Sequence, residues 1–141
     1  MRIRLWLLII SFTFYSCVYA GQEKKKISLS GVELIVDVSD TDQSRQKGLM
    51  FKPRMDELEG MLFIFENQAR YSFWMKNMQF PIDIIWVSED KKVVYIAEDA
   101  LPCQGSCPSF SPDKSAKYVL ELNSGFVKNH QVKVGDSLFF E

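Results

Sequence analysis

Residues 60–83 constrain the fold most, because two different strand patterns follow each other there. Residues 61–65 form an unbroken run of five apolar side chains, which is typical of a strand covered on both faces. Residues 71–76 alternate instead, so Phe73 is expected to face the core and Trp74 to face outward with a serine and a lysine. The segment therefore predicts two strands of a β-rich domain, the second of which presents an indole.

Residues 1–20 have the parts of a secretory signal peptide, with Arg2 and Arg4, an apolar stretch, and Ala20 before the expected cleavage site. The apolar stretch is shorter than the about 20 residues that a membrane-spanning helix needs. We therefore expect cleavage after Ala20 and an exported protein, either periplasmic or extracellular. Lipid attachment at Cys17 is the alternative, and it would make the protein a lipoprotein. Contact with a membrane is expected only through the signal peptide or through a lipid anchor at Cys17.

The rest of the chain has the size of one domain, and we divide it into a basic linker at residues 21–26 and a folded domain at residues 27–141. The sequence has 17 basic and 18 acidic residues and a formal net charge of −1, so no nucleic-acid partner is expected. Cys103 and Cys107 remain after cleavage, and a disulfide between them is expected in an oxidising compartment. Closing so short a loop contributes about 2 kcal/mol.

Short strand patterns and turn residues alternate along the domain and predict a mainly β fold, an antiparallel sandwich or barrel with one or two short helices. A helix is expected at residues 43–47, where Gly48 can end it. Residues 98–115 hold three prolines and both cysteines and are expected to form a long loop. The expected strands are residues 27–38 with a bend at Gly31, 61–65, 71–76, 82–87, 92–97, 117–122 and 137–140.

Several blocks occur in a fixed order: SRQKGLMF at 44–51, GMLFIF at 60–65, FWMKN at 73–77, PIDI at 81–84, Cys103 and Cys107, YVLEL at 118–122, and then Gly125 and Gly135. With these spacings the sequence resembles the secreted prokaryotic domain of unknown function 192, DUF192, over nearly all of the mature chain. The resemblance implies an exported β-sandwich of jelly-roll type and no agreed biochemical activity. Met78 and Lys52 depart from the threonine and the arginine that are common in that family.

An outward indole with polar neighbours predicts a surface that binds a sugar ring or an extended peptide, through stacking and hydrogen bonds. Arg45, Lys76, Asn77 and Asp83 are the candidate polar groups around Trp74, and Lys76 is the nearest expected partner of the Asp83 carboxylate. These residues indicate a binding or accessory module of the cell envelope, with a glycan or peptide as partner. Two alternative interpretations are that the proline-rich loop covers the indole and that the arginine is a solvated charge.

A second hypothesis is copper(I) binding by thioethers, the ligands that select this ion. The candidates are Met50, Met61, Met75 and Met78. Most of them lie beside apolar residues, where methionine commonly fills gaps in a core. The core interpretation is therefore preferred, and no metal or other cofactor is expected.

A third hypothesis is an envelope hydrolase that uses paired carboxylates, which requires two of them to meet in one cleft with Trp74. The unplaced candidates are Asp83, Glu98, Asp99 and Glu121, and the alternation of Glu121 with two leucines predicts that it faces solvent. No catalytic motif is recognised, because His130 is the single histidine and no nucleophile elbow occurs.

Overall fold

The computed structural model of the protein describes residues 23–140. The predicted signal peptide, including Cys17 and Ala20, lies outside the described residues. In this range neither helix has the length and apolar character needed to cross a membrane. The elements are β1 (Lys24–Leu29), β2 (Val32–Ser39), α1 (Asp42–Lys47), β3 (Glu59–Ala69), β4 (Phe73–Trp74), β5 (Ile82–Val87), β6 (Val93–Ala100), β7 (Ser109–Phe110), β8 (Ala116–Asn123), α2 (Phe126–Asn129) and β9 (Leu138–Phe140).

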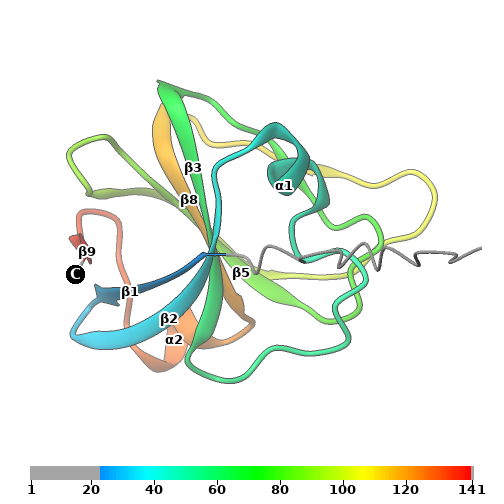
Figure 1. Cartoon of the computed structure of the whole chain (residues 1–141), viewed down its shortest axis with the longest axis horizontal. Helices are drawn as coiled ribbons and strands as arrows, with labels where there is room; N and C mark the ends of the chain where they lie inside the picture. Colours follow the sequence, from blue (N-terminus) through cyan, green and yellow to red (C-terminus); the bar gives the residue numbers. More distant parts are fainter. Residues whose placement is uncertain (1–22, 141) are drawn as a thin grey trace, which may run out of the picture.

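Seven strands form one curled sheet in the order β6-β5-β8-β3-β2-β1-β9 (Figure 1). The sheet curls until its two edges meet, since Lys92 and Ser137, which precede β6 and β9, form an antiparallel bridge. The predicted mainly β domain with two short helices is confirmed. One pair, β2 and β3, is parallel rather than antiparallel. Residues 40–58, which include α1, provide the long connection that a parallel pair requires.

Two apolar cores occupy the two faces of the sheet. The first core takes side chains from all seven strands and from α2, so it fills the inside of the curl. The second core lies on the outer face of β3, β5, β6 and β8, under the short ribbon of β4 and β7 and the segments beside it. Because β3, β5 and β8 are central strands covered on both faces, their sequences are almost continuously apolar.

The N-terminal expectations are corrected in two places. Residues 24–26 are not a linker, because they form the start of β1 and pair with β2, where the exposed ammonium of Lys24 contacts Glu59 at 3.3 Å. Residues 27–38 are not one strand but a hairpin, which turns at Ser30 and Gly31. Both turn residues have positive φ, as the two-residue turns that suit hairpins require.

Two segments next to the second core differ from their predictions, since one strand is shorter than expected and one expected loop contains strands. The strand expected at residues 71–76 is reduced to Phe73 and Trp74, which form β4 beside β7, and to an isolated bridge at Lys76. The long loop expected at residues 98–115 contains the end of β6 and all of β7. Cys103 and Cys107 form the predicted disulfide, and Cys103 bridges to Lys76, so this segment is tied to the end of β4.

Candidate functional site

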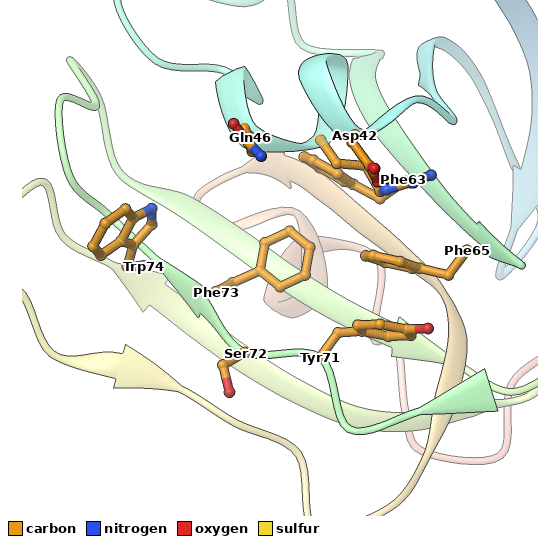
Figure 2. Close-up of a pocket in the computed structure, with 9 residues that line it drawn as sticks. Asp42, Gln46, Phe63, Phe65, Tyr71, Ser72, Phe73 and Trp74 are labelled. Atoms are coloured by element: carbon orange, nitrogen blue, oxygen red, sulfur yellow. Dashed lines mark hydrogen bonds and ion pairs between the residues drawn. The ribbon is translucent and has the colours of Figure 1, made fainter. Parts of the chain in front are cut away.

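An open cleft of about 550 Å³ lies between α1 and β4 (Figure 2). Aromatic side chains come from β3 and from residues 71–74, while helix α1 supplies polar side chains on the opposite wall. Such a lining, mostly apolar with a few polar groups, is typical of a binding site for a small ligand. The lining residues are Asp42, Arg45, Gln46, Phe63, Phe65, Tyr71, Ser72, Phe73 and Trp74.

Helix α1 is fixed at both ends and along one side. Thr41 and Ser44 form a capping box at its start, and Gly48 follows its last residue with a positive φ. The Arg45 guanidinium donates to the Ile64 carbonyl at 2.8 Å, so the helix is attached to β3. The interpretation of Arg45 as a solvated charge is wrong, because its side chain is 18% exposed and lies over the Phe65 ring.

The aromatic wall is held by ring contacts. Phe65 and Tyr71 stack with their centroids 3.5 Å apart, and Phe73 meets Phe63 edge-on at 4.9 Å. The Trp86 indole N–H, beneath this wall, donates to the Tyr71 carbonyl at 2.8 Å. Rings fixed in this way lose little further freedom when a ligand binds, so the cleft is largely preformed.

Trp74 stands at one end of the cleft, with its indole directed toward the helix that carries Gln46 (Figure 2). Half of its surface, 50%, is exposed, so the predicted outward orientation is confirmed and the alternative of an indole covered by the proline-rich loop is wrong. The Lys76 ammonium lies 5.2 Å from the centre of the ring, at a distance typical of a cation–π contact. The structure therefore brings Arg45, Trp74 and Lys76 to one region.

Asp83 lies elsewhere, and its predicted pairing with Lys76 is wrong. Its carboxylate is fully buried and accepts two backbone N–H groups, from Asp99 and Val127, each at 2.9 Å. Val127 belongs to the first core, so this carboxylate is on the face of the sheet opposite Trp74. Two charge-assisted hydrogen bonds to the backbone satisfy a buried carboxylate without a lysine.

Asn77 shapes a turn and does not line the cleft. Its φ is 59°, and its carbonyl accepts the N–H of Phe51 at 3.0 Å. Its side-chain amide points toward the sulfur of Met50, at 3.9 Å. These contacts connect the segment after α1 to the segment after β4. Met61, Met75 and Met78 are buried in the second core, which fits the interpretation that they fill gaps there.

Glu121 lies in the interior, although its alternation with two leucines predicts a side chain that faces solvent. The prediction that it faces solvent is wrong: it is 4% exposed, and its Oε2 has no hydrogen-bond partner within residues 23–140. Burial raises the pKa of this carboxyl to about 8. The reason is its strand, because β8 lies between β3 and β5 and is covered on both faces. The nearly unbroken apolar run around Glu121 was the signal that could have revealed this.

The Glu121 side chain lines a small hollow of about 30 Å³, which has room for a water molecule. Gly48 borders the hollow, and a Cβ at that position would lie 4.0 Å from Glu121 Oε2 and 3.3 Å from the Phe63 ring. The hollow and the cleft share Arg45, Gln46, Phe63, Phe73 and Trp74 as lining residues. The buried carboxyl is therefore next to the floor of the cleft.

Comparison with protein families gives one match over almost the whole described chain. The model of the DUF192 family, described as "Uncharacterized ACR", matches residues 25–140. Two relatives are UPF0127 proteins of Thermococcus gammatolerans and Thermococcus kodakarensis, 26% identical over 106 residues and 27% identical over 101 residues. The matches cover 75% and 72% of this chain but only 66% and 61% of the relatives, so this chain spans less than two thirds of their length.

Two solved structures have similar folds. One is a Sinorhizobium meliloti protein provisionally described as a transcription regulator, with a TM-score of 0.77, 32% identity, and coverage of 84% of this chain and 95% of that chain. The other is a Novosphingobium aromaticivorans protein of unknown function, with a TM-score of 0.77, 28% identity, and coverage of 86% of this chain and 88% of that chain. These similarities support the mainly β fold described above.

Proposed function

The chain belongs to the DUF192 family, whose members are uncharacterised, and we propose that it is an exported module that binds a glycan of the cell envelope in the cleft between α1 and β4. The observation that carries the proposal is the half-exposed Trp74 at one end of a cleft with further aromatic rings. Sugar rings have an apolar face that stacks on an indole and a rim of hydroxyl groups that form hydrogen bonds.

The opposite wall supplies the polar groups that a glycan needs. Asp42 and Gln46 line the cleft from α1, and the Arg45 guanidinium holds the Asp42 carboxylate at 2.6 Å. A planar amide and an oriented carboxylate each contact hydroxyl groups on neighbouring ring positions. Lys76, against the indole, adds a positive charge at the same end of the cleft. Asn77 and Asp83 are not part of the proposed surface, because their polar groups are engaged elsewhere.

The envelope location rests on two features of the chain. The signal-peptide pattern in residues 1–20 directs export. The Cys103–Cys107 disulfide supports an oxidising compartment, since such bonds persist mainly outside the cytosol. The disulfide also lies close to the site, because Cys103 bridges to Lys76. Export of a tagged full-length chain, followed by cell fractionation, tests this part separately.

The test of binding is calorimetric titration of the mature chain with soluble oligosaccharides from the cell wall and with N-acetylhexosamine oligomers. Trp74→Ala removes the stacking surface and is expected to weaken binding at least about fivefold, since the stacking of one base on an aromatic side chain contributes about 1–3 kcal/mol. Phe139→Ala is the matched control, because Phe139 is 62% exposed on β9, far from α1 (Figure 1). Equal affinity of the Trp74 variant and the wild type would contradict the proposal. Binding of extended peptides but no oligosaccharide would assign the cleft to peptides instead.

A second candidate function is hydrolysis of a glycosidic bond, and one observation favours it. The cleft contains Asp42, ion-paired with Arg45, and the hollow beside it contains Glu121, whose pKa is raised by burial. Glycosidases use a pair of carboxyl groups in different environments, one of them with a raised pKa. New reducing ends released from an oligosaccharide by the wild type, and lost in Glu121→Gln, would establish this activity. Binding without release would exclude it for that substrate.

A further inference from the structure

The two buried carboxyl groups on the central strands of the sheet are treated differently by the fold. Asp83 on β5 accepts two backbone N–H groups, as expected for a carboxylate with a structural role. Glu121 on the neighbouring β8 is almost as buried, yet its Oε2 has no partner within the described residues 23–140. An unsatisfied buried polar group costs about 1–3 kcal/mol, so an apolar residue would be more stable at this position. The difference suggests that Glu121 has a partner from outside the chain.

The space next to Glu121 admits one small polar group. The hollow has a volume of about 30 Å³, which accommodates one water molecule or one hydroxyl group. Gly48 borders it, and a Cβ there would approach the Phe63 ring at 3.3 Å and Glu121 Oε2 at 4.0 Å. The absence of a side chain at residue 48 keeps this space open. Phe73 and Trp74 line both the hollow and the cleft. One substituent of a sugar ring that stacks in the cleft can therefore reach into the hollow.

Burial, and not a neighbouring charge, sets the protonation of Glu121. Arg45 and Lys47, both on α1, are the charged residues that line it besides Glu121. The Arg45 guanidinium is already bound to the carbonyl of Ile64 and the carboxylate of Asp42. The lining residues from β3, from β4 and from the segments that follow α1 and β4 are apolar, apart from the backbone of Gly48. Desolvation among these residues raises the pKa of Glu121 to about 8.

We propose that the Glu121 carboxyl is a specificity-determining group that receives one hydroxyl of the bound glycan in the hollow beside Gly48. The proposal rests on the glycan-binding function proposed above and adds which part of the ligand is selected. A protonated carboxyl has one donor and one free acceptor, and a hydroxyl group also has both, so the two form a reciprocal pair. A ligand without that hydroxyl leaves the carboxyl unpaired, and such sites discriminate strongly against the analogue that lacks the group.

Binding also becomes dependent on pH, because ionisation removes the proton that the carboxyl donates. With a pKa of about 8, about one tenth of the molecules hold the protonated carboxyl at pH 9. The apparent affinity falls by the same fraction, so about tenfold weaker binding is expected at pH 9 than at pH 6.

The test compares the mature wild type with Glu121→Gln and Glu121→Leu, using the oligosaccharide of the panel above that binds the wild type most tightly. The glutamine amide keeps a donor and an acceptor, so Glu121→Gln is expected to bind within about threefold of the wild type at pH 6 and to lose the pH dependence. Glu121→Leu offers neither and is expected to bind at least about tenfold more weakly. Circular dichroism checks that each variant is folded. The deoxy sugar that lacks the selected hydroxyl should bind the wild type and Glu121→Leu equally weakly.

The outcomes separate this proposal from the binding function itself. In one outcome the wild type binds the oligosaccharide, Trp74→Ala does not bind it, and Glu121→Leu binds as the wild type does at every pH. The cleft then binds glycans, but Glu121 has no part in selecting them. That result overturns the inference and leaves the hollow to a structural water. If the wild type binds no oligosaccharide, the glycan function and the inference both fail.

Discussion

Replacing Glu121 with glutamine should remove a large pH dependence of the free energy of unfolding. Burial raises the folded-state pKa from the ordinary 4.5 to about 8. Between these two pH values the folded protein keeps a proton that the unfolded chain releases, so the unfolded state binds fewer protons. The stability that this proton supplies is fully present below pH 4.5 and is lost as the pH rises to about 8.

The size of the effect follows from the width of this interval. A separation of about 3.5 pKa units corresponds to about 5 kcal/mol, of which about 3 kcal/mol is already lost at pH 7. Because Glu121 is 4% exposed, solvent screening does not greatly reduce this figure. Glutamine at this position cannot titrate, so the variant should gain stability relative to the wild type by about 1.4 kcal/mol per pH unit between pH 5 and pH 8.

Urea unfolding of the mature protein at unit pH steps from 5 to 9 measures this difference. Val119→Ala is the matched control, since Val119 lies two residues away on the same face of β8 and is also buried in the second core. Its cavity should lower the stability at every pH without changing the slope. A difference between Glu121→Gln and the wild type that is flat from pH 5 to pH 8 would refute the argument that burial keeps this carboxyl protonated.

Two further predictions concern the scaffold of the site. Arg45→Met removes the hydrogen bond to the Ile64 carbonyl, so the protein should lose about 2 kcal/mol of stability and the amides of α1 should exchange faster with deuterium; unchanged exchange in the helix would contradict the attachment. Gly60→Ala places a Cβ 2.5 Å from Leu122 Cδ2 and 2.9 Å from a backbone oxygen, so it should cost more than about 3 kcal/mol in thermal unfolding. Gly31→Ala, with open space around it, should cost about 1 kcal/mol through its positive φ, and equal losses at the two glycines would contradict the close packing of β3.

Much of the fold follows from local sequence patterns. The apolar run in β3, the strand at β5 and the helix that ends at Gly48 lie where the patterns predict them. The parallel pairing of β2 with β3 could not be read from the sequence, because it depends on how α1 and its loops return the chain. Residues 24–26 look like a linker, although the backbone of any residue can pair at the edge of a hairpin.

The site was only partly predictable, for a related reason. The alternation around Trp74 gives its direction, since neighbouring side chains of an extended segment point to opposite sides. The positions of Asp83 and Glu121 depend on which strands lie in the middle of the sheet, and this is a long-range property. A carboxylate in a strand with one covered face points to solvent, whereas one in a strand with two covered faces is buried in either direction.

The central claim is that a sugar ring stacks on Trp74, and the indole N–H signals of the mature chain in a ¹H–¹⁵N NMR titration test it most directly. Removal of residues 1–20 leaves two tryptophans, Trp74 in the cleft and Trp86 buried beneath it, so the second indole is an internal control. With a cell-wall oligosaccharide as titrant, the account predicts a large, saturable shift of the Trp74 signal and a small shift of the Trp86 signal. A Trp74 signal that stays unchanged while the oligosaccharide binds elsewhere on the protein would contradict it.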